Sequence, residues 1–571
     1  MCGIVGILNQ SDEQIVMKMA QSVAHRGPDG INWLTISSSS LGASRLAIKG
    51  DPHASAIFCD AETNVAVMLN GEIYNIEALR ADLAKAGCKF HTDLESEVIS
   101  ELYKRDGLDF ATQLKGMFAI AILDGNQLIL ARDRFGIKPL YYAKIGQRVL
   151  FGSEIKAILA HPEFKAKLYF PAVEETNVFG YIYSPDRTLF DGITQVEPGT
   201  AVAFCEDKQI CKRFWQAPQA SYFNPTCHTD FPDAVSQLRN LIIKTVDLLL
   251  SHGDHAVGIY LSGGLDSTIL ALVARAILGY PVTTFTLADA SETADLIAAR
   301  EVAKKLGTQH IERRVTVDDY FNRLKHFVRH YEAIVAGGVF DIHGGVAFHL
   351  LSETISEYVK VALSGEGADE LFGGYYWIYT HPLGFADRVR NRLAQLNGCG
   401  DGISRLVNSL FPLPENEHIY RRNLFDALMR GGLANYHLQS VDRSAGAYGF
   451  EVRPAFLFDE LAAFALNLPI EYKVPNKNVT KQILREAFKP ELEKLGLDWV
   501  ATRLKEGMPA AVSSLAPVIN QKIEDSISNS SLTRHPFKKY LQSKFDMYLF
   551  DIFAETFLPE AIYAIQDCTT Q

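Results

Sequence analysis

Apolar and polar positions follow two different patterns along this chain. Across about the first 200 residues, short apolar runs typical of β-strands alternate with turn residues and with two helical patterns. The strand-like runs lie at 2–8, 41–48, 65–69, 117–123 and 128–131. The serine run Ser37–Ser40 is typical of a surface hairpin loop. These features predict packed sheets flanked by helices.

In the remainder of the chain, strands and helices alternate one by one. Helical patterns cover 234–250, 268–278 and 294–306, and apolar strands cover 257–261, 282–286 and 360–363. Alternation of this kind predicts a doubly wound parallel sheet with helices on both faces.

A change in composition separates the two patterns. Residues 216–230 are rich in Pro, Ser, Thr and Asn, which is typical of a linker. We therefore expect an α+β domain at 2–205, a linker at 206–230 and an α/β domain at 231–571. The length of 571 residues agrees with this division, because it is too long for one hydrophobic core.

Composition and charge narrow the class of protein. Apolar residues make up 47% and charged residues 22%, as in an ordinary globular enzyme. The net charge is -11 with both signs interspersed, so we expect no nucleic-acid partner. No window approaches the ~18 uncharged apolar residues of a membrane helix, and the N-terminus lacks a signal-peptide pattern. The 8 cysteines show neither metal-ligand nor disulfide spacing, which favours a reducing compartment. We expect a cytoplasmic protein that acts on small molecules, without a membrane partner.

Cys2 is the first candidate for chemistry. Removal of the initiator methionine would make Cys2 the N-terminal residue, and its own α-amine, which titrates near ~8, could then accept the thiol proton. A thiolate produced in this way is a strong nucleophile. The alternative is a small buried cysteine at the start of an apolar strand, and Cys2 alone does not separate the two interpretations.

A glycine-rich loop follows the predicted strand at 257–261. Its sequence is Ser262-Gly263-Gly264-Leu265-Asp266-Ser267. A strand that turns into a helix here gathers backbone N–H groups and a helix N-terminus at one point, which favours a phosphate. The glycines permit close approach and the serines add hydroxyl donors. Asp266 fits this loop if a divalent cation bridges it to the phosphates. The hexapeptide is more specific than a lone Gly-x-Gly, so we favour a nucleotide site over a simple capped turn.

A second loop, with three acids, follows the strand at 360–363. Its sequence at 364–375 is SGEGADELFGGY. Open parallel sheets bind ligands beyond the carboxyl ends of their strands, so both loops are expected to face one crevice. Acids in such a turn suit metal binding and acid–base chemistry, which we assign to Asp369 and Glu366 respectively. Glu370 is better explained as the residue that opens the next helix, where the helix dipole favours acids.

Together, the segment Cys2-Gly3-Ile4 and the two loops resemble asparagine synthetases of the glutamine-hydrolysing type. The resemblance runs through nearly the whole chain. Its further motifs are 25–30 (HRGPDG), 70–75 (NGEIYN), 132–142 (RDRFGIKPLYY), 151–156 (FGSEIK), 306–310 (LGTQH) and Lys481-x-x-Leu484-Arg485. It implies an N-terminal glutaminase domain with an Ntn-type αββα sandwich, and a C-terminal ATP pyrophosphatase domain of the adenine nucleotide α hydrolase type. It also implies ATP as a substrate and Mg²⁺ as a cofactor.

On the glutaminase side, the resemblance makes Cys2 the nucleophile, and Asn70 and Gly71 the oxyanion hole. An amide side chain and a turn N–H can be preorganised toward one developing charge. An Asn-Gly pair could otherwise be only a hairpin turn. Arg45 falls where the family holds the glutamine carboxylate, a task that suits guanidinium geometry.

The remaining glutamine-binding positions follow from the same resemblance. The wall beside Arg45 continues through Leu46, Ala47, Ile48 and Lys49. Glu72 and Glu95 occupy positions that hold the glutamine amino group. The family usually has Asp where this chain has Glu95, so the longer side chain must shift the local packing.

On the synthetase side, the resemblance assigns ATP binding to nine positions. They are Leu261, Ser262, Gly263, Gly264, Asp266, Ser267, Leu287, Ser364 and Gly365. Leu261 and Leu287 can serve the strand-end core as well. Asp266 and Asp369 are expected metal ligands, and Glu366 acts on attacking ammonia.

Two lysines are candidates for the phosphates. Lys505 matches a family lysine near the phosphates, where its charge would stabilise departing pyrophosphate and the adenylate. For Lys481, a phosphate contact and a solvated surface position stay equally open.

The resemblance implies two half-reactions. Cys2 releases ammonia from glutamine, and ATP converts a carboxylate into an acyl adenylate that the ammonia attacks after travelling through an internal tunnel. With L-aspartate as acceptor, the products are L-asparagine, L-glutamate, AMP and diphosphate, the reaction of EC 6.3.5.4. A non-catalytic module with this fold is disfavoured because the catalytic positions are present.

The acceptor is the least determined part of the prediction. Residues 331–345, where the family builds its aspartate pocket, depart from the family pattern, as do the spacing in 451–459 and Met508. These departures leave open a relative that amidates a different carboxylate in secondary metabolism. The aromatic tail at 526–571 is expected to pack or to form a contact surface, so a homodimer stays open.

Overall fold

The structure is a computed structural model. It describes residues 2–51, 54–217, 229–289, 292–333, 342–375, 378, 381–396, 400–476, 478–503 and 513–558. Residues 218–228 of the expected linker and the position of Lys505 therefore lie outside the described residues.

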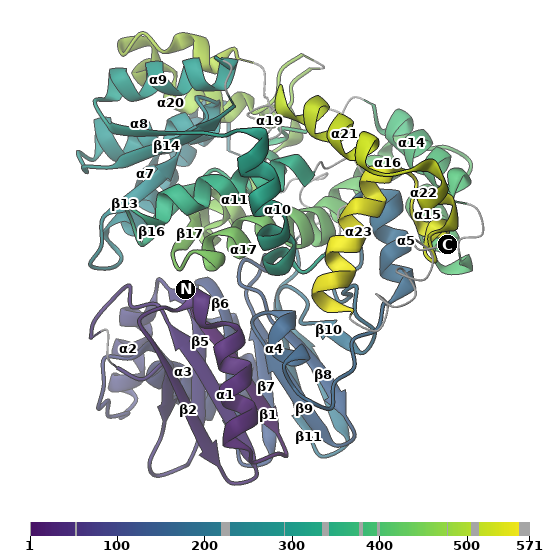
Figure 1. Cartoon of the computed structure of the whole chain (residues 1–571). Helices are drawn as coiled ribbons and strands as arrows, with labels where there is room; N and C mark the ends of the chain where they lie inside the picture. Colours follow the sequence, from purple (N-terminus) through teal and green to yellow (C-terminus); the bar gives the residue numbers. More distant parts are fainter. Residues whose placement is uncertain are drawn as a thin grey trace.

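The N-terminal half contains two six-stranded antiparallel sheets (Figure 1). The first has the order β10-β8-β9-β1-β3-β2. Its strands are β1 (Gly3–Leu8), β2 (Gly30–Ile36), β3 (Ser39–Arg45), β8 (Tyr141–Ile145), β9 (Arg148–Gly152) and β10 (Ile193–Gln195). The second has the order β12-β11-β7-β6-β5-β4. Its strands are β4 (Ile57–Cys59), β5 (Ala66–Ile73), β6 (Gly116–Asp124), β7 (Gln127–Arg132), β11 (Thr200–Cys205) and β12 (Lys208–Arg213).

The alternation of side chains along β1 explains how these sheets stack. Val5 and Ile7 share a core with Val16 of helix α1 (Glu13–Ser22), whereas Ile4 and Leu8 pack between the two sheets. On the outer face of the second sheet lie α2 (Ile76–Lys85) and α3 (Glu95–Asp106). These four layers confirm the αββα sandwich.

Two expected boundaries in this half differ from the structure. The run predicted as one strand at 41–48 leaves the sheet after Arg45, so residues 46–48 form a wall rather than a strand. Strand β12 pairs with β11 along its whole length, so the sandwich continues to Arg213, past the expected domain end at 205. The serine run does contain the turn between β2 and β3, where Ser37 has a φ of 52°.

The C-terminal half contains a five-stranded parallel sheet with the order β15-β14-β13-β16-β17. Its strands are β13 (Val257–Tyr260), β14 (Thr283–Ala288), β15 (Gln309–Arg314), β16 (Val361–Ser364) and β17 (Glu451–Pro454). The strands after β13 are added on one side of it (β14, β15) and then on the other (β16, β17). The boundary between β13 and β16 is therefore the switch point where such sheets bind ligands. The predicted doubly wound sheet is thereby confirmed.

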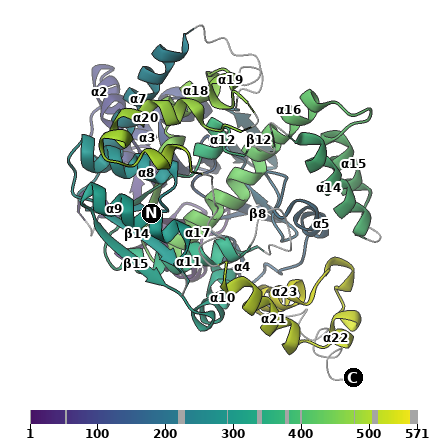
Figure 2. The same ribbon diagram turned by 90° about the horizontal axis from the view of Figure 1, so that it is seen from above.

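Helices surround this sheet (Figures 1 and 2). They include α7 (Phe231–Ser251), α8 (Leu265–Leu272), α9 (Ala294–Leu306), α10 (Val317–Tyr331), α11 (Ile342–Ser356), α12 (Ala368–Phe372), η4 (Leu428–Leu438), α17 (Gln439–Ala447), α18 (Asp459–Asn467), α19 (Ile470–Lys473) and α20 (Gln482–Lys494). Helix α8 begins at Leu265, earlier than the predicted start at 268, because Gly264 ends the loop. Asp266 and Ser267 therefore lie in its first turn.

A third group of helices lies to one side of the sheet, around α5 (Phe170–Phe179) of the N-terminal half (Figure 1). It consists of α14 (Pro382–Gln395), α15 (Asp401–Leu410), α16 (Glu417–Ala427), α21 (Leu515–Ser526), α22 (Asn529–Arg534) and α23 (Lys544–Phe557). Phe553 of α23 packs on Phe190 with ring centroids 5.5 Å apart. The described part of the aromatic tail therefore packs against the N-terminal half, which was one of the two roles expected for it.

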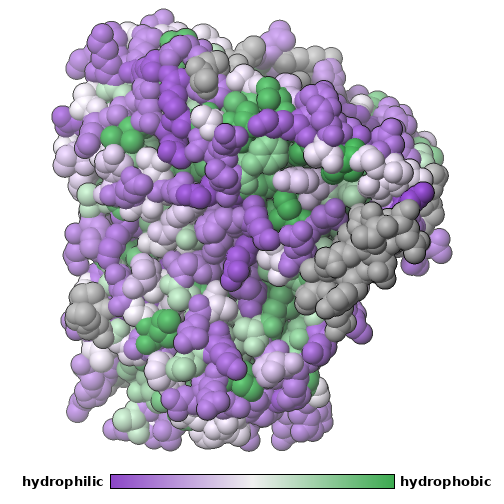
Figure 3. Space-filling model, in the orientation of Figure 1, coloured by the Kyte–Doolittle hydropathy of each residue, from purple (hydrophilic) through white to green (hydrophobic). Residues whose placement is uncertain are grey.

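Two further expectations concern membrane-spanning helices and a dimer surface. Among the described residues, no helix combines the length and apolar character that crossing a bilayer requires. On the face shown in Figure 3, hydrophobic residues form small groups separated by hydrophilic ones. This face does not single out a dimer surface, so the homodimer stays a prediction.

Candidate active site

Cys2 lies immediately before strand β1 and is half-buried rather than enclosed. Its backbone N donates to Oδ1 of Asn70 at 3.0 Å, and its carbonyl oxygen accepts from Nε of Arg26 at 3.1 Å. These contacts hold the backbone of Cys2 in place immediately before the strand. The arrangement favours the nucleophile over the buried strand cysteine.

Asn70 is fully buried, yet its Nδ2 has no hydrogen-bond partner among the described residues. A buried donor without a partner costs stability unless a ligand satisfies it. Because Oδ1 of the same amide is already held by the backbone of Cys2, the amide is fixed beside that residue. This is the property that an oxyanion donor needs.

Gly71 is not part of a hairpin turn. Strand β5 continues through it, with Asn70 opposite Ala119 and Gly71 opposite Phe118. Gly71 has a φ of 136°, and a Cβ at this position would lie 1.9 Å from the carbonyl oxygen of Met117. The alternative that Asn70 and Gly71 form a simple turn is therefore wrong. Glycine is required here by the close approach of β6.

The expected glutamine-binding wall is only partly directed inward. Arg45 is buried and donates to the carbonyl oxygens of Ala54 (2.9 Å) and Lys49 (3.5 Å). Leu46, Ala47 and Ile48 are also buried. The side chain of Lys49 is instead half-exposed and faces Glu77 at 3.5 Å. The structure thus gathers the wall except for the Lys49 side chain.

Glu72 and Glu95 lie close together at the end of this wall. Oxygen atoms of both carboxylates and a ring nitrogen of His252 lie within 4.8 Å of one another. Burial raises the pKa of Glu95 well above its ordinary value, and the neighbouring Glu72 raises it further. Oε1 of Glu95 has no hydrogen-bond partner among the described residues. A substrate ammonium would compensate both acids.

The second site lies at the switch point of the parallel sheet. In the loop after β13, Oγ of Ser267 accepts from the backbone N of Ser262 at 3.2 Å, which folds the loop over the N-terminus of α8. Gly263 has a φ of 69°, and a Cβ there would lie 2.5 Å from Cβ of Ala298. A Cβ on Gly365 would lie 3.1 Å from Cβ of Asp266, so the loops after β13 and β16 are in contact.

These two loops line a cavity of about 180 Å³ that opens to solvent. The predicted ATP-binding positions that line it are Leu261, Ser262, Gly264, Asp266, Ser267, Leu287, Ser364 and Gly365. Gly263 does not line it but packs behind the loop against α9. Glu366, Asp369, Lys481 and Arg503 are among the other residues that line it.

Lys481 is a buried residue of this cavity and not a surface lysine. It is 4% exposed, and its Nζ lies 2.5 Å from Oδ2 of Asp266 and 2.7 Å from Oδ1 of Asp369. Its φ of 56° is rare for a residue with a side chain, and such strain clusters at functional sites. The solvated surface position considered for Lys481 is therefore wrong, and its phosphate contact stays a prediction.

The pair Asp266 and Asp369 also fits a divalent cation. Both carboxylates contact the same Nζ of Lys481, and Oδ1 of Asp266 is buried without a hydrogen-bond partner among the described residues. A Cβ on Gly374 would lie 1.7 Å from Oδ1 of Asp369, so this space must stay free of a side chain. Hard oxygen donors of this kind suit Mg²⁺.

Glu366 contacts a residue that the sequence did not single out. Nδ1 of His437, on the π-helix η4, lies 3.7 Å from Oε2 of Glu366, and Nε2 of His437 lies 3.0 Å from the hydroxyl of Tyr375. That hydroxyl donates to Oε1 of Glu370 at 3.2 Å. A lone histidine in an apolar helix carries no signal in one sequence, so His437 could not be found there.

Glu370 lies in the first turn of α12, as expected, but it is also buried. Burial, followed by the charge of Glu366, raises its pKa to about 7.

Arg503 is a second residue that the sequence did not reveal. Its Nη2 pairs with Oδ1 of Asp295 at 2.5 Å and its Nη1 donates to the carbonyl oxygen of Ser262 at 3.3 Å.

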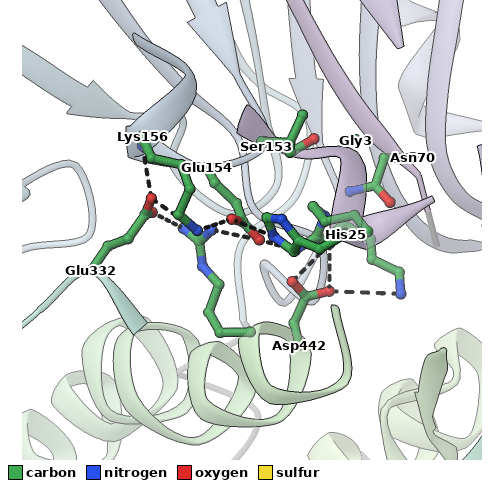
Figure 4. A network of polar contacts seen from close by, with 12 residues as sticks. Gly3, His25, Asn70, Ser153, Glu154, Lys156, Glu332 and Asp442 are labelled. Atoms are coloured by element: carbon green, nitrogen blue, oxygen red, sulfur yellow. Dashed lines mark hydrogen bonds and ion pairs between the residues drawn. The ribbon is translucent and has the colours of Figure 1, made fainter. Parts of the chain in front are cut away.

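A buried ionic network joins the two halves of the molecule between these sites (Figure 4). Glu154 of the sandwich accepts a hydrogen bond from Arg26 (2.8 Å) and forms an ion pair with Arg443 of α17 (3.2 Å). Glu154 is also paired with Lys156 and with His25. Burial would raise the pKa of Glu154, but these cations hold it well below its ordinary value.

Glu332 extends this network from the C-terminal half. It ends helix α10 in a left-handed conformation with a φ of 60°. Its carboxylate accepts from the backbone N of Ile155 (2.8 Å) and of Lys156 (2.7 Å), and it pairs with Arg443 at 2.9 Å. The helix that begins at Ile155 is therefore capped by a residue from the other domain.

Some expected features lie outside the described residues. These are Lys505, Met508 and residues 334–341 of the expected acceptor pocket. The run 451–459 is described: Glu451 pairs with Arg453 at 3.1 Å, and both are buried.

Comparisons with known proteins agree with this division of the chain. The family described as "Glutamine amidotransferase domain" matches residues 1–215, and the family described as "Asparagine synthase" matches residues 237–551. Asparagine synthetase [glutamine-hydrolyzing] 1 of Bacillus subtilis is 28% identical over 95% of this chain and 92% of its own length. Asparagine synthetase [glutamine-hydrolyzing] 3 of the same organism is 30% identical over 95% and 94%. A synthetase 3 of Arabidopsis thaliana is 29% identical over 86% and 75%.

Proposed function

Because the chain belongs to the glutamine-hydrolysing asparagine synthetase family, we propose that it is an ATP-dependent amide ligase that takes its nitrogen from glutamine. The observation that carries the proposal is the presence of two separate built sites in one chain. One presents a thiol beside an unsatisfied amide donor, and the other presents two glycine loops with paired acids and a buried lysine.

At the first site, Cys2 with a free α-amine attacks the side-chain amide of glutamine. Nδ2 of Asn70 stabilises the oxyanion of the tetrahedral intermediate. Ammonia leaves, and water hydrolyses the resulting thioester to glutamate. Arg45 binds the glutamine carboxylate, and Glu72 with Glu95 binds its ammonium group.

At the second site, a carboxylate attacks the α-phosphorus of ATP, and pyrophosphate leaves. Backbone N–H groups of the loop at 262–267 bind the phosphates, and Lys481 stabilises the departing charge. Asp266 and Asp369 would hold Mg²⁺, which supplies Lewis-acid stabilisation of the phosphates. Glu366 accepts a proton as ammonia attacks the acyl adenylate.

We propose L-aspartate as the acceptor, which gives L-asparagine, L-glutamate, AMP and diphosphate. The family relationship supports this choice. The expected acceptor pocket departs from the family pattern, and a different carboxylate is therefore the outcome to test against. We also propose that the partners are small molecules and that the protein acts in the cytoplasm.

Release of pyrophosphate from ATP, with Mg²⁺ and glutamine present, across a panel of carboxylates tests this proposal. Stimulation by L-aspartate, with asparagine formed in equal amount, is the expected result. Stimulation by another carboxylate alone would overturn the asparagine assignment and leave the ligase chemistry intact. Release that no carboxylate stimulates would overturn the ligase assignment.

A further inference from the structure

The loop between α7 and β13 belongs to the C-terminal domain but lies against the glutamine-binding wall. The backbone N of Asp254 donates to the carbonyl oxygen of Ile48 at 3.1 Å. Oδ2 of Asp254 accepts from the backbone N of Gly50 at 3.2 Å. Nε2 of His255 lies 3.0 Å from the carbonyl oxygen of Ala47. The loop therefore follows the backbone of the wall residue by residue.

Gly253 is fitted to this contact. It has a φ of 117°, and a Cβ there would lie 2.9 Å from Cγ2 of Ile48. Any side chain would be strained and would also meet the wall. The close approach of the loop to the wall thus depends on glycine.

His252, the first residue of this loop, enters the glutamine site itself. Its Nε2 lies 2.9 Å from Oε2 of Glu72, within the group that also includes Glu95. The imidazole packs against Tyr74 of the N-terminal domain, with ring centroids 5.1 Å apart. Glu72 is thereby contacted by a side chain from the other domain.

The position of His252 is fixed from the synthetase side. Nη1 of Arg453 donates to the carbonyl oxygens of His252 and Leu249, both at 2.7 Å. Arg453 belongs to β17 of the parallel sheet and is itself held by Glu451 at 3.1 Å. The imidazole is therefore anchored to the sheet that carries the nucleotide loops.

We propose that His252 is a positioning residue of the glutamine site, supplied by the synthetase domain. This inference rests on the proposed function, in which Glu72 and Glu95 bind the ammonium group of glutamine. Nε2–H of His252 donates to Glu72 and orients its carboxylate toward that ammonium. Full affinity for glutamine then requires the two domains to be packed as observed, because one hydrogen bond of the site crosses between them.

Glutamate release from glutamine by the full chain tests the inference through His252→Ala. Loss of one hydrogen bond to a charged group predicts a rise in KM for glutamine of about tenfold or more. The kcat should stay within about twofold, since binding is weakened equally in the ground state and in the transition state. His252→Gln places an N–H donor near the same point and should restore most of the affinity.

A substrate without the α-amino group, 4-carbamoylbutanoate, separates positioning from general damage. Glu72 has no ammonium to bind in this substrate, so His252→Ala and the parent protein should hydrolyse it equally well. As a matched control, Lys115→Ala removes a more exposed interdomain pair with Glu460 (2.8 Å) and should leave KM for glutamine unchanged.

Binding of Mg-ATP verifies that each variant is folded. Should His252→Ala fail this check, Gly253→Ala, which pushes the loop from the wall, is expected to raise KM while kcat is retained. An unchanged KM in His252→Ala, or an equal loss with 4-carbamoylbutanoate, would overturn the inference. Absence of glutamine hydrolysis in the parent protein would instead overturn the proposed function.

Discussion

The glutaminase site and the synthetase site are built in opposite ways. The first is assembled on strands of the sandwich, where Asn70 is held within β5 and Cys2 lies immediately before β1. The second is assembled from loops after β13 and β16, which line a cavity of about 180 Å³ that opens to solvent. A small amide substrate needs hydrogen-bond donors fixed within bonding distance of its carbonyl oxygen. A triphosphate needs a larger space lined by several backbone N–H groups.

The two sites also differ in how charge is handled. At the glutamine site, the carboxylates of Glu72 and Glu95 lie close together, and in the proposed function they bind the ammonium group of the substrate. At the nucleotide site, Lys481 already lies between Asp266 and Asp369. At the glutamine site the ammonium group of the substrate would supply the positive charge that the acids need. At the nucleotide site the protein supplies this charge itself, through Lys481. The following predictions address whether the sites are as separate as this implies.

The largest expected effect is that of Cys2→Ala. Loss of the nucleophile should lower glutamine hydrolysis by about 10⁴-fold or more, whereas Mg-ATP binding should be unchanged. Glutamate release and nucleotide binding are the two measurements. Loss of nucleotide binding in a folded variant would show that the sites are not separate.

The network between the sites should matter for stability rather than for either reaction alone. Arg443→Met leaves Glu154 and Glu332 buried with one cation fewer, which should cost about 3–5 kcal/mol in the free energy of unfolding. Urea denaturation measures the loss. The exposed pair Lys325 and Glu555 is the control, since Lys325→Met should cost less than about 1 kcal/mol. Equal losses in both variants would contradict the buried role.

Lys481→Ala is the counterpart of the cysteine variant at the other site. Removal of one preorganised charge should slow pyrophosphate release by about 10²–10³-fold and leave glutamine hydrolysis unchanged. Lys494→Ala, at the exposed end of the same helix, is the matched control. A similar effect from both lysines would indicate damage to α20 instead of a phosphate contact.

The smallest expected effect concerns pH and the domain boundary at Asp459, which pairs with Arg134 at 2.7 Å. Burial raises the pKa of Asp459 from 3.8 to about 6 despite this partner. Because the folded state holds the proton more tightly, the stability from Asp459 is full below its unfolded pKa and is lost as pH rises toward 6. The difference corresponds to at most about 3 kcal/mol. Asp459→Asn should flatten this part of a stability–pH curve, and an unchanged slope would contradict the assignment.

Much of the fold and of both sites could be predicted from the sequence, because short motifs encode them. The loop at 262–267 and the Asn-Gly pair contain glycines at backbone conformations and close contacts that residues with a side chain rarely allow. Lys481 stayed undecided because burial of a lysine depends on two distant acids. His437, His252 and Glu332 could not be found at all, since each acts on a residue far away in sequence across a helix or a domain boundary.

The boundary at residue 205 illustrates the same limit. Strand β12 contains exposed, charged positions and lies at a sheet edge, so it carries no apolar pattern to mark it as part of the sandwich. Only its pairing with β11 assigns it to the N-terminal domain.

The most direct test of the central claim uses glutamine labelled with ¹⁵N in its side-chain amide, together with Mg-ATP and L-aspartate. Two coupled sites predict one ¹⁵N-labelled amide product for each pyrophosphate released, and a loss of label in Cys2→Ala that ammonium restores as unlabelled product. Pyrophosphate release without transfer of the label, or a failure of ammonium to support synthesis in folded Cys2→Ala, would contradict the account.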